Sequence, residues 1–461
     1  MGKRSGRQRQ EELWIASGTV VQTPGHVFYN RLNAVLAQHG FDARVERLCR
    51  RFYQGPRGQP SVAPGTYFRC LLIGFFEGLD SERGIAWRAA DSLSLRKFLG
   101  YGVDEATPDH STISRTRRLV WLSTHRAVFR WVLRILKAEG LLKGRTIAID
   151  ATTLEANAAM RSIVRRDTGA AYDAYITRLA EAAGIEQPTR EQLARFDRKR
   201  KKKGSNQEWT HPNDPDARIT RMKDGRTHLA HKAEHAVDLS TGALLEVTLH
   251  PADVGDTTTG LETLAAAQAT AQAVGLAAIT EAVLDKGYHS GAVLEGVAAA
   301  GIRSYVSEPK RGRRHWRDKR AEQRAVYGNR RRLRGTRNKR LQAQRAELSE
   351  RSNAHMYETG AMRRVYLRGR KNILKRLLLH AAAFNLALVM RTIHGVGTPR
   401  GLQGFTAATA DLRGRLRTGC RTLGESVRRV HVRLLRTAFP AWTPFPSSET
   451  RARTTVSTTG C

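Results

Sequence analysis

The chain has 461 residues, of which 40% are hydrophobic and 26% are charged, a balance typical of a globular protein with at least one sizeable core. Its 79 Lys and Arg outnumber its 42 Asp and Glu and give a net charge of +37. This excess predicts a polyanionic partner, because each phosphate that a basic side chain neutralises releases counterions. No apolar run reaches the roughly 20 residues of a membrane span, the first residues lack the apolar centre of a signal peptide, and the four cysteines match no zinc or disulfide pattern. We therefore expect a cytoplasmic protein without a membrane partner.

Residues 1–140 are expected to form a helical domain, because their apolar residues recur near helical spacing. Within them, TPDHSTISRTRRL carries a helix start, with Asp109 or Ser111 as the N-cap after a proline. Arg115 and Arg118 follow in the first turns of this helix. An arginine-lined helix of this kind suits contact with DNA, and a simple solvated face is the alternative.

A strand pattern starts near residue 145. The residues from Thr146 to Ile149 are expected to form a buried strand that ends on Asp150. After it we expect a hairpin, a helix, a strand that ends on Asp285, a helix and a strand. These elements lie at 227–256, 257–276, 281–285, 292–302 and 303–308. Strands that alternate with helices in this way predict a mixed α/β sheet flanked by helices.

A polar excursion at 158–224 separates the first strand from the hairpin. Two helices are expected in it, one in AAYDAYITRLAEAAG and one opened by a capping box from Thr189 to Gln192. The run RKRKKK (198–203) is either a patch that contacts phosphates or a solvated helix end. Trp209 either stacks on a nucleic-acid base or packs against its own loop.

The most basic part of the chain is 310–345, which holds 16 Lys or Arg against two acids. A helix is expected at 341–360, and a basic stretch leads into an amphipathic helix within 362–393. The tail at 396–461 is rich in Gly, Ser, Thr and Arg, and we expect it to be loosely ordered.

Three histidines, His228, His231 and His235, invite a zinc interpretation. On a helix they would share one face, where imidazole nitrogens can bind zinc. Their stretch is predicted as a strand, however, and residues three apart on a strand point to opposite sides. Structural zinc is therefore the weaker interpretation.

Asp150 and Asp285 each follow an apolar strand, although Asp is disfavoured in strands. Each is either a turn or N-cap residue or a metal ligand. Two carboxylates held close together repel unless a cation neutralises them, and Mg²⁺ prefers one or two carboxylates together with phosphate oxygens. A third acid for a two-ion site would come from the helix at 341–360, where Glu350 is preferred and Glu358 is the alternative.

Five stretches of the chain are similar to bacterial insertion-sequence transposases of the DDE class. They are IAIDATTLEANA, DARITRMKDGRTHLAHKAEHAVDLSTGALLEVTLHPADVGDTTT, AVLDKGYHSG, ERSNAHMYETGAMRRVYLRGRKNILKRLLLHAAAFNL and, near the N-terminus, TPDHSTISRTRRL. The resemblance implies a ribonuclease-H-like catalytic core that is interrupted by an insertion after the first strand. It also implies two Mg²⁺ ions, for which Mn²⁺ can substitute, and cutting and joining of DNA at the element's terminal inverted repeats.

The resemblance places the three catalytic, metal-binding acids on Asp150, Asp285 and Glu350. Asp150 would bridge both ions, Asp285 would share one of them, and Glu350 would complete the second. Some relatives carry a Tyr, Arg, Glu, Lys signature around the last acid. The other three positions of that signature are held here by Ala343, Ala346 and Tyr357. This departure keeps Glu358 as the second choice for the third acid.

Basic residues near the acids are predicted to contact DNA. Lys286 and His289 follow the second acid and either contact the scissile phosphate or pack at the strand end, and Arg351 can orient Glu350 by a charge-assisted hydrogen bond. The full set of predicted contacts is Arg115, Arg118, Lys286, His289, Arg351, Arg363, Arg364, Arg368 and Lys371. The implied partners are double-stranded DNA, as transposon ends and target, and a second copy of the chain in a homodimer. The implied location is the bacterial nucleoid.

The expected domains are an N-terminal helical, DNA-binding domain at 1–140, a catalytic domain at 141–395 and the tail at 396–461. Three functions fit this organisation. One is a transposase that cleaves and joins DNA, the second is a catalytically decayed relative kept for DNA binding, and the third is a nuclease of the same fold that hydrolyses without joining. The presence of all three acids favours the transposase.

Overall fold

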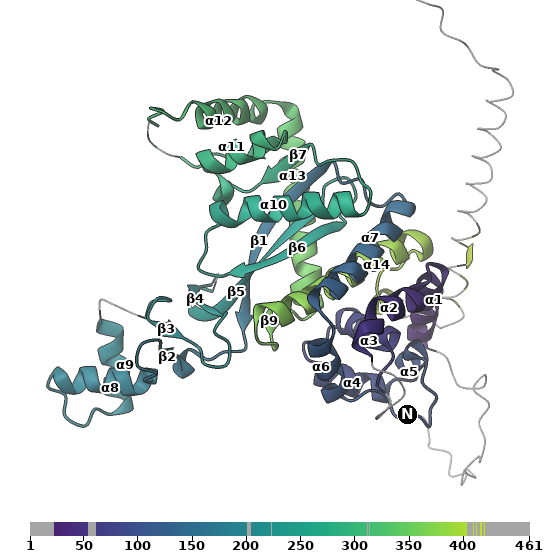
Figure 1. Cartoon of the computed structure of the whole chain (residues 1–461), viewed down its shortest axis with the longest axis horizontal. Helices are drawn as coiled ribbons and strands as arrows, with labels where there is room; N and C mark the ends of the chain where they lie inside the picture. Colours follow the sequence, from purple (N-terminus) through teal and green to yellow (C-terminus); the bar gives the residue numbers. More distant parts are fainter. Residues whose placement is uncertain are drawn as a thin grey trace, which may run out of the picture.

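The computed structural model describes residues 23–53, 61–200, 204–222, 224–310, 312 and 314–402, together with a few positions between 409 and 419. A sheet lies near the centre of the molecule, with the N-terminal helices packed below it and α12 at the opposite end (Figure 1). A separate lobe that contains α8 and α9 projects to one side (Figure 1).

The described N-terminal region is helical, as the spacing of its apolar residues predicted. Its helices are α1 (Pro24–Gln38), α2 (Phe41–Cys49), α3 (Pro64–Phe76), α4 (Glu82–Asp91), α5 (Leu93–Leu99), α6 (His110–Leu119) and α7 (Leu122–Ala138). Asp109 is the N-cap of α6, and its carboxylate accepts a hydrogen bond of 2.8 Å from the backbone N–H of Ser111. This confirms the predicted helix start.

A buried ion pair fixes α6 to α4. Arg117 Nε donates to Glu82 Oε1 at 2.6 Å, and the two side chains are only 7% and 10% exposed. The backbone carbonyl of Arg117 also accepts a 2.8 Å hydrogen bond from the buried Lys375 ammonium on α14 (Arg370–His394). Helix α6 is therefore held both by its own domain and by a helix from the far end of the chain.

We expect Glu82→Gln to lower the free energy of unfolding by about 3 kcal/mol, because removing one partner leaves a buried charge uncompensated. Urea unfolding of the full chain measures the difference. The matched control is Glu347→Gln, which removes a carboxylate that is 62% exposed and should change stability by less than about 1 kcal/mol. Equal effects of the two substitutions would contradict a stabilising role for the buried pair.

One seven-stranded mixed sheet forms the centre of the fold. Its strands are β1 (Thr146–Ala156), β4 (Arg218–Arg221), β5 (Thr227–Asp238), β6 (Leu244–Pro251), β7 (Glu281–Leu284), β8 (Arg303–Val306) and β9 (Arg364–Val365). The order β6-β5-β1-β7-β8 runs across the sheet, β4 pairs with β5, and β9 pairs with β1. β5 is antiparallel to β1 and β6, whereas β7 is parallel to β1 and β8. The predicted mixed α/β sheet is thus confirmed.

Strand β1 continues well past the residue at which it was expected to end. Asp150 lies inside the strand and pairs with His235 of β5, and this antiparallel pairing continues to Glu155. Only the parallel pairing with β7 stops before the acid, at Ile149 and Leu284. The prediction that the strand ends on Asp150 was wrong because the ladder with β5 overrides the poor strand propensity of Asp. Asp285, by contrast, directly follows β7 as predicted.

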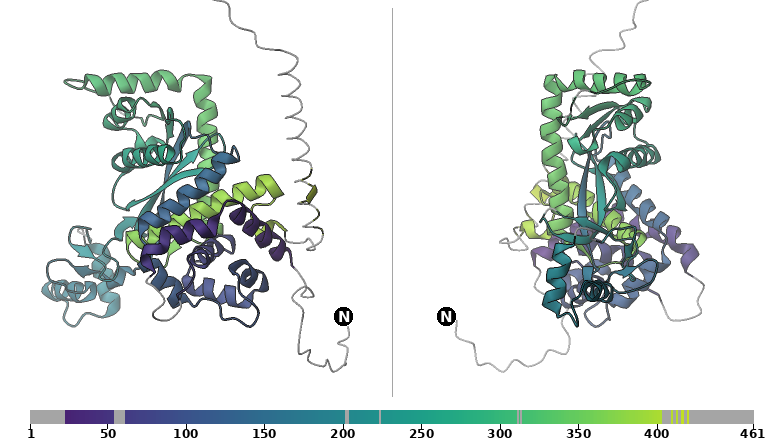
Figure 2. Two further views of the ribbon diagram at one scale, coloured as in Figure 1. Left: turned by 45° about the vertical axis from the view of Figure 1, so that its right-hand side comes forward. Right: turned by 90° about the vertical axis from the view of Figure 1, so that its left-hand side faces the viewer.

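Helices cover both faces of the sheet (Figure 2). They are α10 (Asp256–Ala273), α11 (Gly291–Ala299), α12 (Arg320–Leu333) and α13 (Thr336–Asn353). Two neighbouring residues of β5 identify the faces, because successive side chains on a strand point to opposite sides. Glu234 accepts a hydrogen bond from Thr263 of α10, whereas His235 bonds Ser352 of α13. Helices α10 and α13 therefore lie on opposite faces of the sheet.

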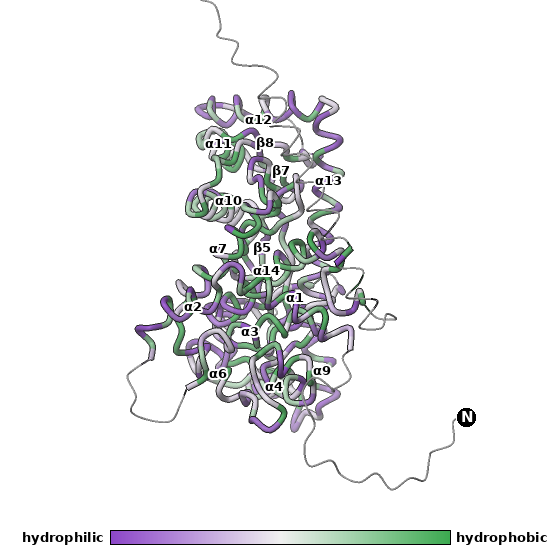
Figure 3. Tube along the Cα trace, turned by 90° about the vertical axis from the view of Figure 1, so that its right-hand side faces the viewer, coloured by the Kyte–Doolittle hydropathy of each residue, from purple (hydrophilic) through white to green (hydrophobic). Residues whose placement is uncertain are grey.

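Helix α14 is a core helix that is buried on most sides, and not the amphipathic helix that was predicted. It packs against α3, α7 and β6, and a single hydrophobic cluster that runs from Val27 to Leu402 includes most of its apolar side chains. The tube of Figure 3 shows hydrophobic residues along it and hydrophilic residues along α12. From the sequence we expected no segment long and apolar enough to cross a membrane, but the segment from α14 to Leu402 is one by length and composition. Of its most apolar window, however, 89% is buried inside the protein. Burial on all sides explains its uniform hydrophobicity.

The excursion after β1 forms the projecting lobe. It contains β2 (Val164–Arg165), α8 (Tyr172–Ala182), α9 (Arg190–Lys199) and β3 (Trp209–Thr210). The capping box of α9 is present as predicted. Trp209 is only 2% exposed and packs edge-on against Tyr172 and Tyr175, which supports packing within the lobe. Strand β4 then pairs with β5 of the main sheet. Residues 201–203, the end of the basic run RKRKKK, and most of the predicted tail lie outside the described residues.

Candidate catalytic site

The two strand-associated aspartates meet at one edge of the parallel pair β1 and β7. Ile149 and Leu284 are the last paired residues of these strands, so Asp150 and Asp285 are the next residues on adjacent strands. Neighbouring strands lie about 4.8 Å apart, which brings the two carboxylates together from 135 positions apart in the chain. Their side chains are 26% and 45% exposed, so the pair is accessible from solvent.

A single guanidinium group lies between these carboxylates. Arg345 of α13 approaches Asp285 Oδ1 with Nη2 at 3.4 Å and Asp150 Oδ1 with Nη1 at 4.0 Å. Asn353, two turns further along the same helix, donates from Nδ2 to Asp150 Oδ2 at 3.3 Å. The positive charge of Arg345 offsets the repulsion that two adjacent carboxylates create. The sequence interpretation missed both residues, and only the packing of α13 on the sheet reveals them.

Helix α13 is fixed over the site by a buried histidine. His235, the cross-strand partner of Asp150, lies 3.1 Å from Ser352 Oγ through Nδ1 and 2.5 Å from the Tyr357 hydroxyl through Nε2. Burial lowers the pKa of His235 to about 3, so the ring is neutral at pH 7. Tyr357 lies in a π-helical turn, Ala354–Thr359, that follows α13, and such turns are frequent at functional sites. Tyr357, which replaces the lysine of the family signature, therefore packs in the core.

The third acid is less closely tied to the aspartates. Glu350 is exposed on α13 one turn before Asn353, and its carboxylate has no ion-pair or hydrogen-bond partner among the described residues. Glu358 is also exposed, but its carboxylate pairs with Arg363. Within the described chain, no group of three or more His, Cys, Asp or Glu side chains is positioned to hold a metal ion. The structure thus brings two of the three predicted acids together.

Two of the predicted basic residues, Arg363 and Arg364, lie beyond Asp150 along β1. Arg363 donates from Nη1 to Thr152 Oγ1 at 3.2 Å, and Arg364 lies 3.7 Å from the Glu155 carboxylate. A cleft of about 390 Å³ opens here. Its lining residues are Thr152, Thr153, Glu155, Met222, Asp224, His228, Glu358 and Arg363. Cationic groups therefore continue from the aspartates along the sheet.

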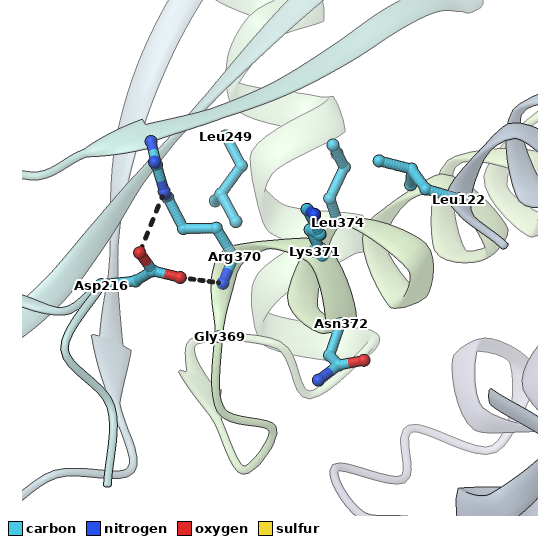
Figure 4. Close-up of a pocket in the computed structure, with 8 residues that line it drawn as sticks. All are labelled: Leu122, Asp216, Leu249, Gly369, Arg370, Lys371, Asn372 and Leu374. Atoms are coloured by element: carbon cyan, nitrogen blue, oxygen red, sulfur yellow. Dashed lines mark hydrogen bonds and ion pairs between the residues drawn. The ribbon is translucent and has the colours of Figure 1, made fainter. Parts of the chain in front are cut away.

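A second cleft, of about 440 Å³, lies at the start of α14 (Figure 4). Lys371 lines it, and the predicted Arg368 is exposed nearby. Asp216 accepts a 3.0 Å hydrogen bond from the backbone N–H of Arg370, and Asp214 accepts one of 3.1 Å from Gly369. These carboxylates satisfy two of the free N–H groups at the start of the helix.

The remaining predicted contacts differ in accessibility. Lys286 is exposed after Asp285, and Arg115 and Arg118 are exposed on α6. His289 is fully buried with Arg314 Nη2 3.2 Å from its Nδ1, so it presents no surface to DNA in this structure. Arg351 pairs with Glu347 and not with Glu350 as expected. The expectation failed because residues four apart on a helix face each other, whereas sequence neighbours do not.

The three histidines of the zinc interpretation have separate partners. His228 lies 3.1 Å from Asp224, and His231 lies 3.2 Å from the buried Asp214, while His235 bonds α13. They lie on strand β5 as predicted, and in the described structure they form no shared metal site.

Two models of known protein families match this chain. Residues 142–386 match a family model described as "Transposase DDE domain", and residues 20–119 match one described as "Transposase domain (DUF772)". The chain belongs to the insertion-sequence DDE transposases. The catalytic-domain match spans both aspartates, α13 and most of α14. No curated protein and no solved structure matches the transposase.

Family membership assigns the transposase to DNA transposition. The first match ends with α6 and the second begins just before β1. Helix α7 lies between the two matched regions and packs on α14. The helices of the first region and the sheet of the second therefore share one hydrophobic core.

Proposed function

We propose that the transposase binds the terminal inverted repeats of its element and catalyses Mg²⁺-dependent DNA cleavage and strand transfer. The observation that carries the proposal is the meeting of Asp150 and Asp285 on adjacent strands, beneath the guanidinium of Arg345. In the strand order β6-β5-β1-β7-β8, β5 is antiparallel to its neighbours β6 and β1, and β1, β7 and β8 are parallel. This arrangement supports a ribonuclease-H-like core. The lobe after β1 is the insertion into that core.

The pair of aspartates suits a hard divalent cation. Both groups supply oxygen atoms and both are partly exposed. The guanidinium of Arg345 offsets only one of their two negative charges. Mg²⁺ commonly binds through one or two carboxylates and substrate phosphate oxygens, so DNA would provide the remaining ligands. When bound, the metal supplies charge neutralisation at the phosphodiester and activates the attacking hydroxyl group or water. Asp150 and Asp285 would hold it, and Asn353 fixes the orientation of the Asp150 carboxylate.

Glu350 is the third acid in this proposal. It shares α13 with Arg345 and Asn353, the two residues of the helix that contact the aspartates. Its carboxylate has no competing partner in the described chain, whereas that of Glu358 is engaged by Arg363. A second ion would therefore recruit Glu350 with little loss of existing contacts.

The DNA would be held by the exposed cations on either side of the aspartates. Lys286 follows Asp285, Arg363 and Arg364 contact β1 beyond Asp150, and Arg368 and Lys371 lie at the start of α14. Arg115 and Arg118 are exposed on the N-terminal domain. We propose domains at 1–140 and 141–395, a homodimer that pairs two transposon ends, and a location in the bacterial nucleoid.

A strand-transfer assay tests the proposed function. The full chain is incubated with a labelled, pre-cut element end, a target duplex and Mg²⁺. Joined product supports the transposase, hydrolysis alone supports a nuclease, and binding without either reaction supports a decayed DNA-binding protein. The second and third outcomes would each overturn the proposal.

We expect Arg345→Gln to bind Mn²⁺ about tenfold more tightly than the wild type, because a cation near 4 Å repels another by about 1 kcal/mol or more. Titration calorimetry on the DNA-free protein measures the affinity. Arg351→Gln is the matched control on the same helix, and its side chain pairs with Glu347 instead. Weaker binding by Arg345→Gln would show that the guanidinium organises the carboxylates for the metal.

A further inference from the structure

Helix α12 presents an unpaired row of arginines to solvent. Arg320, Arg324, Arg331 and Arg334 are exposed, and none has an ion-pair partner among the described residues. With Tyr327 they follow the spacing i, i+4, i+7, i+11 and i+14, which places them on one side of a helix. We call these five residues the basic stripe. From Arg320 to Arg331 it extends about 16 Å, over which one DNA strand carries about five phosphates.

The opposite side of α12 is fixed to the body of the protein. Asn329 exchanges two hydrogen bonds with the backbone of Val306, at 3.0 and 2.8 Å. Arg330 makes a bidentate pair with Glu308 at 2.7 and 2.9 Å, and Arg332 donates to the Ser304 carbonyl at 2.8 Å. The basic stripe therefore faces outward from an ordered helix, so little backbone conformational entropy is lost when it binds.

Among the described residues, no acid forms an ion pair with the arginines of the stripe. Glu322, the one acid within α12, points the other way, since its carboxylate covers Gly291 at the start of α11. Tyr327 is 46% exposed, with Arg330 5.2 Å from its ring centre. An aromatic ring among exposed arginines is typical of surfaces that bind nucleic acid, and two basic stripes would repel each other across an interface between copies.

One side of α13 is exposed between the stripe and the residues near the proposed catalytic site. Lys339, Ala343, Ala346 and Glu350 are all exposed on α13, and their spacing of i, i+4, i+7 and i+11 places them on one side of that helix. Between Lys339 and Glu350, the short side chains of the two alanines do not project far from the helix. Helix α12 ends next to the start of α13 (Figure 2). We therefore expect a duplex that leaves the site along this side of α13 to reach Lys339 and then the stripe.

We propose that the basic stripe, together with Lys339, binds the phosphate backbone of the DNA duplex that leaves the catalytic site along α13, without reading its sequence. The inference rests on the proposed function, because it takes DNA as the substrate of that site. The N-terminal domain lies at the opposite end of the molecule from α12 (Figure 1). The stripe would thus hold a different DNA segment from the one that the N-terminal domain holds.

The test uses the full chain carrying Asp150→Asn, so that bound DNA is not cut. Fluorescence anisotropy measures its affinity for a random-sequence duplex of about 40 base pairs at several salt concentrations. We expect the double variant Arg324→Gln, Arg331→Gln to bind about tenfold more weakly at low salt and to reduce the slope of log K against log salt by about two, one for each lost phosphate contact. An element-end duplex should lose the same factor.

Two matched variants make the result specific. Arg324→Lys with Arg331→Lys keeps the charge and should restore the salt slope. Arg178→Gln with Arg195→Gln removes the same charge from exposed positions of the projecting lobe and should leave the slope unchanged. An unchanged slope in the stripe variant, a loss confined to the element end, or an equal loss in the lobe variant would overturn the inference. Failure of the wild-type chain, which retains Asp150, to cut or join DNA would refute the proposed function. Undiminished DNA binding by the stripe variant would refute only this inference.

Discussion

Asp150→Asn is expected to lower DNA cleavage and strand transfer by at least about 10³-fold, while affinity for an element-end duplex changes little. The substitution keeps the shape of the side chain and the hydrogen-bonding position next to Asn353, but it removes one of the two charges that would hold the metal. A loss of about 4 kcal/mol of transition-state stabilisation corresponds to this factor. Single-turnover cleavage of a labelled end gives the rate, and anisotropy gives the affinity.

The control lies on the same strand. Glu155→Gln removes a carboxylate that is paired with Arg364, five residues beyond Asp150, and should leave the cleavage rate within a few-fold of wild type. The third acid is tested in the same assay, where Glu350→Gln should match the loss in Asp150→Asn and Glu358→Gln should not. Cleavage that survives in Asp150→Asn would show that this carboxylate does not hold the metal.

The second large effect is loss of stability in mild acid, caused by buried neutral histidines. Burial lowers the pKa of His125 to about 3 and that of His235 to about 3, and it lowers the pKa of His380 well below its ordinary value. The unfolded chain binds protons near pH 6.5, so the stabilisation is complete above pH 6.5 and is lost as the pH falls toward the folded-state values. Each such histidine contributes about 1.4 kcal/mol per pH unit to this loss. Urea unfolding at pH 7.5, 6.5 and 5.5 measures it.

His125 offers the clearest single test, because it lies in the N-terminal domain, whereas His235 is the cross-strand partner of Asp150 in the proposed catalytic site. Its Nδ1 is 2.9 Å from the Trp121 carbonyl and its Nε2 is 2.9 Å from the Tyr67 hydroxyl. The carbonyl can only accept, so the neutral ring donates from Nδ1 and accepts at Nε2. His125→Gln should reduce the pH slope of stability by about 1.4 kcal/mol per unit, whereas His315→Gln, at an exposed position, should leave it unchanged. Identical slopes in His125→Gln and wild type would contradict this account.

Local signals in the sequence predicted most elements correctly. The N-cap at Asp109, the capping box at Thr189 and the acid that follows β7 all depend on residues a few positions apart. The alternation of apolar residues predicted the strands, and the motifs around Asp150 and Asp285 placed the chain in its family. These features need no knowledge of which segments pack together.

Tertiary packing decided what local pattern could not. The ladder with β5 carried β1 past Asp150, and contacts on both sides buried α14. Packing also buried Trp209 and His289, which had been open to either interpretation.

By itself, the sequence determined the chain's positive charge, its order of helices and strands, and the two aspartates that mark the family. Only the tertiary structure decided that Arg345 and Asn353 contact the two aspartates and that the four arginines of the basic stripe have no ion-pair partner among the described residues. The physical reason is distance along the chain. Helix caps and strand patterns arise from neighbours in sequence, whereas the charge that balances a carboxylate pair is set by whichever distant helix packs across the sheet.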